Sequence, residues 1–294
     1  MEATNVPFAI LIGIISTIQL HLAKALERQG IEVFDQLRAR INKTRQQIDG
    51  DNKKPIIYTI GVILNNTIFI YAIIAQRFAS PAIYTSMFGI GLIFLMIYAR
   101  KVLGEKITRA LLLGSGAILI GTLIIGLENI VRQDVDRFNM AITPTLIPIG
   151  AFVVMGTLAM ITTARTNKSH LIAGVFGIFC GGYGSLDPFL KGMGQNVSGH
   201  PGWVPESWQG WVIFLSSFLI GFASFALTQV AFAKKAPASV FVPVYNASYI
   251  LLPVVLQLIL LPTYKLYWST ISGMGLIILG ISLMRNVIRS EERL

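Results

Sequence analysis

The chain has 294 residues, of which 54% are hydrophobic and 13% charged, and its formal net charge is +10. Soluble domains carry about 25% charged residues, so this composition excludes an ordinary soluble enzyme, and the chain is too apolar to be disordered. A single cysteine, Cys180, excludes a disulfide scaffold. We attribute the excess positive charge to cytoplasmic loops flanking membrane helices, and not to binding of nucleic acid.

Apolar blocks separated by short charged gaps predict an all-α integral membrane protein with nine transmembrane helices. About twenty helical residues suffice to cross the hydrocarbon core of a bilayer. In chain order, the predicted spans cover residues 6–26, 55–76, 79–99, 107–127, 142–163, 169–190, 209–232, 238–261 and 267–285.

The lysine and arginine residues predict how the chain is oriented. With nine spans, 18 of these residues fall on one side of the membrane and five on the other, while Lys24 lies inside a span. Positive residues gather in cytoplasmic loops. We therefore expect a multi-pass protein of the cell (plasma) membrane with its N-terminus outside and its C-terminus in the cytoplasm. The basic gap over residues 27–54 is interpreted either as an amphipathic helix on the inner membrane surface or as a solvated loop.

Short motifs recur in the same order in the two halves of the chain. The matched motifs are Gly13-Ile14 and Gly30 with Gly177-Ile178 and Gly194, Ser80-Pro81-Ala82 with Ala236-Pro237-Ala238, and Gly114, Gly116 and Gly121 with Gly273, Gly275 and Gly280. They predict four-helix repeats over residues 1–127 and 169–294, joined by a connector over 128–168 that contains the fifth span. An odd connector inverts the second repeat, and such a 4+1+4 inverted repeat lets a transporter open alternately to either side.

The stretch Gly104-Glu105-Lys106, followed by Gly114 and Gly121, resembles the repeat signature of the drug/metabolite transporter (DMT/EamA) superfamily. The nine-span layout, the long basic loop after the first span and the segment from Ala236 to Pro243 most resemble the NIPA-type magnesium transporter branch. This resemblance implies a transporter that moves a small solute by alternating access. Two alternatives stay open, a magnesium or other divalent cation transporter and a non-transport membrane scaffold.

Polar side chains inside predicted spans are candidates for the transport site, because burying them in a bilayer is costly. The candidate solute-binding residues are Gln19, Asn65, Asn66, Asp187, Tyr245, Asn246 and Tyr249. Asp187 is the only acidic residue well inside a predicted span, and it is the metal ligand under the cation alternative. The structural alternative for Asp187 is an ion pair with Lys191 at the i,i+4 spacing.

The arrangement of these candidates predicts a cavity lined by the first, second, sixth and eighth spans. Adjacent helical residues point about 100° apart, so we expect one of Asn65 and Asn66 to line the cavity and the other to bond a neighbouring helix. Lys24 is expected to extend to the membrane interface, and His21 is a candidate for proton coupling.

No motif indicates an enzyme or a bound cofactor. The sequence has neither a Walker A loop nor an HExxH motif, and its three histidines lie far apart. We therefore expect no enzymatic activity, with Mg²⁺ or H⁺ as the only candidate inorganic ions, either as substrate or as coupling ion. The expected partners are a small-molecule or ion substrate and the lipid bilayer, with the protein a monomer or a weak homodimer.

Overall fold

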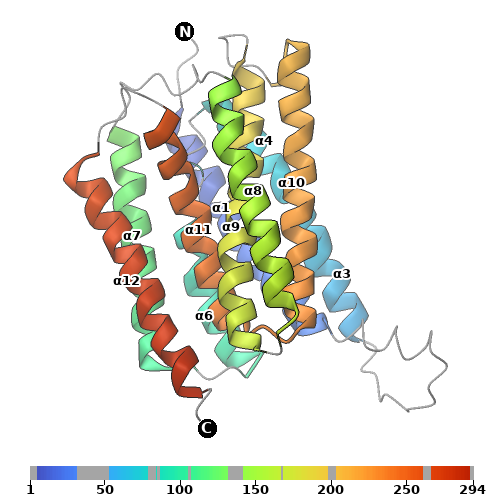
Figure 1. The fold of residues 1–294 in the computed structure, drawn as a ribbon, viewed down its shortest axis with the longest axis vertical. Coiled ribbons are helices and arrows are strands. Elements are labelled where there is room, and N and C mark those ends of the chain that lie inside the picture. The colour runs from blue at the N-terminus through green and yellow to red at the C-terminus, as the bar shows by residue number, and fades with distance from the viewer. Residues whose placement is uncertain are drawn as a thin grey trace, which may run out of the picture.

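The computed structural model describes residues 5–31, 53–78, 84, 87–104, 107–131, 142–166, 168–197, 203–260 and 266–291. These residues form helices and no strand, which confirms the all-α class (Figure 1). The elements are α1 (Val6–Gly30), α3 (Lys53–Asn66), α4 (Ile68–Phe78), the short 3-10 helix η1 (Met87–Gly89), α6 (Gly91–Lys101), α7 (Arg109–Val131), α8 (Ile142–Ala164), α9 (Ser169–Asn196), α10 (Trp208–Ala233), α11 (Ala238–Leu260) and α12 (Trp268–Glu291).

Seven helical stretches in the described part of the chain are long and apolar enough to cross a membrane. They comprise α1, α3 together with α4, and each of α7 to α11. The apolar part of α12 is shorter, covering Trp268–Leu283. At 1.5 Å per residue, the 11 residues of α6 reach about 16 Å, roughly half of a hydrocarbon core. The multi-pass character is thus confirmed, while the count of nine spans stays a prediction.

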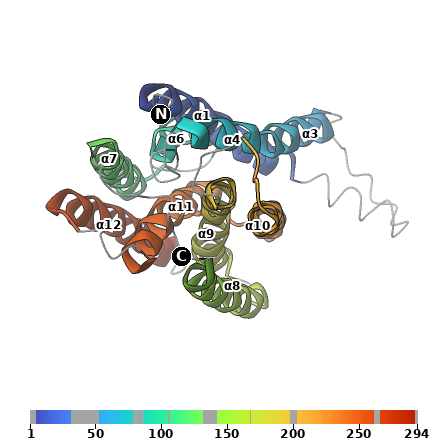
Figure 2. The ribbon, with the colours of Figure 1, turned by 90° about the horizontal axis from the view of Figure 1, so that it is seen from above.

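Viewed from above, α9 and α11 lie in the middle of the bundle (Figure 2). The layer of α1, α3 and α4 covers one side of this pair and α8 covers the opposite side, while α7 and α12 lie together at one end. This placement agrees with burial, since α9 and α11 are the most buried of the long apolar helices. Their small and polar residues are therefore shielded from lipid.

Several predicted features lie outside the described residues. They include most of the basic gap over 27–54, where an amphipathic helix was one expectation, and the turn Ser80-Pro81-Ala82. They also include Glu105 and Lys106 of the superfamily-like signature.

The glycines shared by the predicted fourth and ninth spans bring α7 and α12 into backbone contact. A Cβ atom added to Gly121 would lie 2.5 Å from the carbonyl oxygen of Gly273, and one added to Gly280 would lie 2.5 Å from that of Gly114. Any side chain at Gly121 or Gly280 would therefore force the helices apart. Because the later residue of α12 meets the earlier residue of α7, the two helices run antiparallel.

Matched glycines in the first and sixth spans also have equivalent surroundings. A Cβ atom on Gly13 would lie 3.2 Å from the Met87 Cβ and 3.4 Å from the carbonyl oxygen three residues before Met87. On Gly177 it would lie 3.0 Å from the Val244 Cβ and 3.0 Å from the carbonyl oxygen three residues before Val244. Helix α1 thus packs against η1 as α9 packs against α11.

The glycines at the ends of these helices repeat the relationship. A Cβ atom on Gly30 would lie 2.6 Å from the Tyr58 Cβ and 2.8 Å from the carbonyl oxygen four residues before Tyr58. On Gly194 it would lie 3.0 Å from the Phe214 Cβ and 2.7 Å from the carbonyl oxygen four residues before Phe214. Glycine permits this close crossing in both halves, because a side chain at either position would strike backbone.

Candidate functional site

A cavity of ≈ 440 Å³ lies between helices of the two halves. Its volume falls in the range of small-molecule sites, about 300–1,000 Å³. The lining residues come from α1, the α3–α4 region, α9, α10 and α11, and they are Leu20, Lys24, Asn65, Asn66, Ile68, Phe69, Gly184, Asp187, Lys191, Phe218, Gly221, Phe222, Ser224, Phe225, Tyr245 and Tyr249. The predicted first, second, sixth and eighth spans all contribute. The seventh span, α10, was not expected in the lining and contributes five of these residues.

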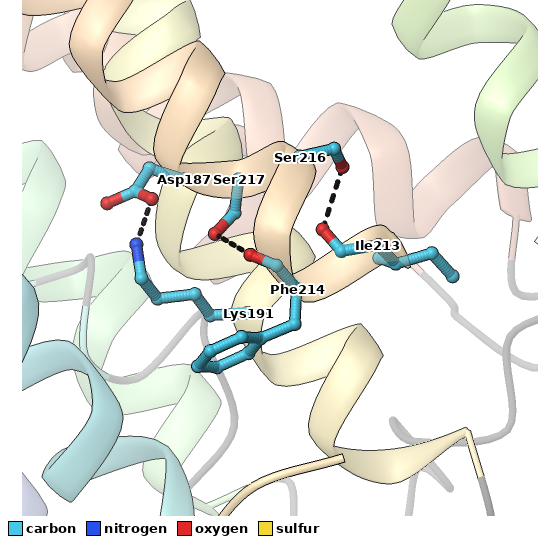
Figure 3. Close-up of polar contacts among 6 residues, drawn as sticks. All are labelled: Asp187, Lys191, Ile213, Phe214, Ser216 and Ser217. Carbon is cyan, nitrogen blue, oxygen red and sulfur yellow. Dashed lines mark hydrogen bonds and ion pairs between the residues drawn. The ribbon is translucent and has the colours of Figure 1, made fainter. Parts of the chain in front are cut away.

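Asp187 and Lys191, which both line the cavity, form an ion pair within α9 (Figure 3). The Lys191 side chain is fully buried and that of Asp187 is 19% exposed. The Lys191 ammonium also lies 4.1 Å from the centroid of the Phe218 ring. Gly221 of α10 allows the close approach, because a Cβ atom there would lie 3.0 Å from the Asp187 Cγ. The structural alternative foreseen for Asp187, pairing with Lys191, is therefore present.

Lys24 is buried beside the cavity and does not reach the membrane interface, contrary to the prediction. Only 2% of the residue is exposed, and its ammonium lies 3.9 Å from the centroid of the Tyr245 ring. An ammonium over the face of an aromatic ring is attracted by the ring's quadrupole, most strongly where water is excluded. The ring of Tyr245 thus replaces part of the hydration that Lys24 loses.

Glu27 is a buried acidic residue that the sequence analysis missed. The residue is 0% exposed, and its two carboxylate oxygens accept hydrogen bonds from Asn65 Nδ2 at 2.8 Å and Gln229 Nε2 at 2.5 Å. Lys24 lies one helical turn earlier and interacts with Glu27 electrostatically. The network joins α1, α3 and α10, and it reaches the cavity through Lys24 and Asn65, which line it.

Tyr245 and Tyr249 form one wall of the cavity, as predicted for the proline-containing eighth span. Their rings are stacked with centroids 5.9 Å apart and an interplanar angle of 28°. The hydroxyls of Tyr245 and Ser224 lie 3.4 Å apart, and Ser224 donates a hydrogen bond of 2.7 Å to the carbonyl oxygen of Cys180. Gly184 faces the Tyr245 hydroxyl, which leaves no room for a side chain on α9 at that point.

Gln19 is not among the lining residues, although it was a candidate solute ligand. Its Nε2 donates hydrogen bonds of 2.8 Å to the Leu64 carbonyl and to the Thr67 hydroxyl, and its Oε1 accepts one of 2.9 Å from Tyr71. These partners lie where α3 ends and α4 begins. Gln19 therefore satisfies backbone and side-chain groups at a helix break, which lipid could not do.

As predicted, one of the two adjacent asparagines, Asn65, bonds a neighbouring helix, but both of them line the cavity. Asn65 donates a hydrogen bond to Glu27, whereas Asn66 Nδ2 donates a hydrogen bond of 2.8 Å to the Val62 carbonyl of its own helix. Asn246 is fully buried, lies outside the cavity lining and interacts with His21. His21 Nδ1 is 2.7 Å from the carbonyl oxygen of Thr17.

The magnesium alternative gains no support from these contacts. A hard divalent cation is held by several oxygen ligands, usually carboxylates, with retained water. In the part of the chain that the structure describes, no three His, Cys, Asp or Glu side chains come close enough to hold a metal ion. Asp187, the predicted ligand, pairs through Oδ1 with Lys191, and a second ammonium, from Lys24, lines the same cavity.

Comparison with protein-family models, curated proteins and solved structures finds no match to this chain. The likeness to the drug/metabolite transporter superfamily therefore rests on the short motifs alone.

Proposed function

We propose that this chain is a membrane transporter that moves a small solute by alternating access. The proposal is carried by one observation, a cavity lined by Lys24, Asp187 and Lys191 within a multi-pass membrane protein. Charged side chains at membrane depth are costly, and they characteristically mark solute or ion pathways. A membrane scaffold would be more stable with apolar side chains in the same positions.

The equivalent glycine contacts support two inverted repeats over residues 1–127 and 169–294. Gly13 and Gly177 meet the same kind of surroundings, as do Gly30 and Gly194. The antiparallel crossing of α7 and α12 is the relationship that inverted copies of one helix require. These contacts favour the proposed 4+1+4 architecture and, with the sequence motifs, membership of the drug/metabolite transporter superfamily.

Two charged contacts at different levels of α10 suit a protein that closes each side in turn. Glu27 and Lys191 each lie three residues before a matched glycine, and α1 and α9 run in opposite directions in the bundle (Figure 1). Their contacts on α10, Gln229 and Phe218, are eleven residues apart, which is about 16 Å along a helix. We propose that the Glu27–Gln229 contact and the Lys191–Phe218 contact each hold one side of the protein closed until solute binding releases it.

Transport can be tested with purified protein in liposomes loaded with a defined mixture of amino acids, organic acids, organic amines and MgCl₂. Mass spectrometry would identify which compounds leave on dilution. We expect loss of a restricted set of organic solutes from wild-type vesicles. Asn66→Trp should abolish the loss by filling the cavity, and Ile63→Trp, on a 57% exposed position of the same helix outside the lining, should not.

The outcomes separate the alternatives. Selective loss of Mg²⁺ that Asp187→Asn prevents would establish the cation alternative. Vesicles that retain every compound, while the protein stays folded, would contradict transport and favour the scaffold.

A further inference from the structure

The cavity contains an ammonium group whose hydrogen-bonding capacity is unused. Lys24 lies over the Tyr245 ring, and among the described residues no hydrogen-bond acceptor contacts its Nζ. Glu27, the acidic residue next to it on α1, has its two carboxylate oxygens engaged by the amides of Asn65 and Gln229. A lysine ammonium has three donors, and Lys24 lines the cavity. An anionic group of a bound solute would satisfy Lys24.

A carboxylate faces the same cavity from the other direction. In the Asp187–Lys191 pair the lysine is fully buried, whereas Asp187 is 19% exposed. Asp187 has two oxygens with about four acceptor sites, and Lys191 contacts only Oδ1. Asp187 therefore retains capacity to accept a hydrogen bond from a cationic group.

Lys24 of α1 and Asp187 of α9 line the same cavity of ≈ 440 Å³. A solute that carries both an acidic group and an ammonium can therefore bind both side chains, through charge-assisted hydrogen bonds.

Aromatic side chains provide the remaining surface. The aromatic lining residues are Phe69, Phe218, Phe222, Phe225, Tyr245 and Tyr249. Such walls favour a solute with an apolar or aromatic body, as in most small-molecule sites.

We infer that the solute is an organic zwitterion with an apolar body, whose acidic group binds Lys24 and whose ammonium binds Asp187. The inference deepens the proposed transport function and rests on it. Charge balance supports it, because Lys24 with Glu27 and Asp187 with Lys191 are each neutral as pairs. A net-neutral solute leaves the closed cavity neutral, whereas a simple anion or cation would bury an uncompensated charge.

The inference is tested on purified wild-type protein with four compounds of one shape: phenylalanine, phenethylamine, 3-phenylpropionate and 3-phenylpropanamide. Binding is measured by calorimetry and by the rise in unfolding temperature, which a ligand produces by mass action. We expect phenylalanine to bind at least about tenfold more tightly than each of the others, since each lost charged hydrogen bond costs that much. Equal affinity for phenethylamine, or no binding of phenylalanine, overturns the inference.

Two variants assign the groups. In Lys24→Met, phenethylamine should bind with the same affinity as phenylalanine. In Asp187→Asn, 3-phenylpropionate should bind with the same affinity as phenylalanine. The exposed Lys234→Met is the matched control and should keep the wild-type order. If Lys24→Met retains full preference for the zwitterion, the assignment of Lys24 is wrong. Should either variant fail to fold, the wild-type series still decides the solute class.

Binding and transport fail separately in these experiments. If phenylalanine binds selectively but does not leave loaded vesicles, the protein has a zwitterion site but does not transport. Vesicles that release only anions, cations or sugars retain the transport function and refute the zwitterion.

Discussion

Glu27 and Gln229 are 202 residues apart in the chain, and the Gln229 amide donates a hydrogen bond of 2.5 Å to the Glu27 carboxylate. This contact joins the first helix of one half to a cavity-lining helix of the other. A buried carboxylate held by two amides and accompanied by Lys24 is balanced only while every member is present.

Glu27→Gln should therefore destabilise the protein. It leaves the buried ammonium of Lys24 without its negative partner, and removing one member of a buried charge pair costs about 3–5 kcal/mol. Thermal unfolding in detergent should show a lower midpoint, whereas Glu206→Gln at an exposed position should not. The double variant Lys24→Met with Glu27→Gln should recover much of the loss. An unchanged midpoint for the single variant would show that Glu27 is already neutral in the folded protein.

The glycine contact between α7 and α12 provides a test of packing with an internal control. Gly121→Ala places a Cβ atom 2.5 Å from the Gly273 carbonyl oxygen, whereas a Cβ atom at Gly116 on the same helix meets nothing within 4 Å. Overpacking costs about 1–3 kcal/mol, while alanine in an open helical position stabilises by about 0.5–1 kcal/mol. Unfolding midpoints should fall for Gly121→Ala and hold or rise for Gly116→Ala. Equal midpoints would contradict the close crossing.

Much of the fold was predictable because hydrophobic length and composition determine which segments can cross a membrane. Asn65, Asp187 and Tyr245 were recognisable as site candidates for the related reason that polar atoms in such segments require partners. Glu27 was missed because the first span was ended at residue 26, where charged residues begin. The helix continues to Gly30, and Gln229 and Asn65 compensate the buried acid. Partners on other helices carry no signal in the local sequence.

The aromatic wall from α10 was missed for a different reason. A phenylalanine facing a cavity and one facing lipid satisfy the same hydropathy pattern, so Phe218 and Phe225 were indistinguishable from lipid-exposed residues. Gln19 shows the reverse error, since its polarity marked it as a solute ligand. Its partners Leu64 and Thr67 instead lie at a helix break, which hydropathy did not reveal.

Gln19→Leu should weaken the junction of α3 and α4. The variant removes two donated hydrogen bonds and leaves the Tyr71 hydroxyl without the amide oxygen that now accepts from it. Unsatisfied buried groups cost about 1–3 kcal/mol each, so the unfolding midpoint should drop clearly. Thr59→Val serves as control, because Thr59 is exposed and bonds only its own helix. Faster amide exchange in α4 for Gln19→Leu would locate the loss, and unaltered exchange would refute it.

The Asp187–Lys191 pair should obey the logic of buried charges. Asp187→Asn leaves the fully buried Lys191 uncompensated and should lower the unfolding midpoint, at a cost of about 3–5 kcal/mol. Adding Lys191→Met should restore most of the stability but not the transport of solute. If Asp187→Asn unfolds at the same midpoint as the wild type, the pair contributes little to the stability of the fold.

The orientation inferred from charge can be tested with two variants that each add one cysteine to the native Cys180. Glu206→Cys precedes α10 and Lys234→Cys follows it, both at exposed positions, while the native Cys180 is buried. Because one helix separates the two sites, they must lie on opposite sides of the membrane. We expect a membrane-impermeant maleimide to label Glu206→Cys on intact cells and Lys234→Cys only after permeabilisation. The reverse pattern would place the N-terminus inside under the nine-span arrangement, and labelling of both on intact cells would contradict a membrane-crossing α10.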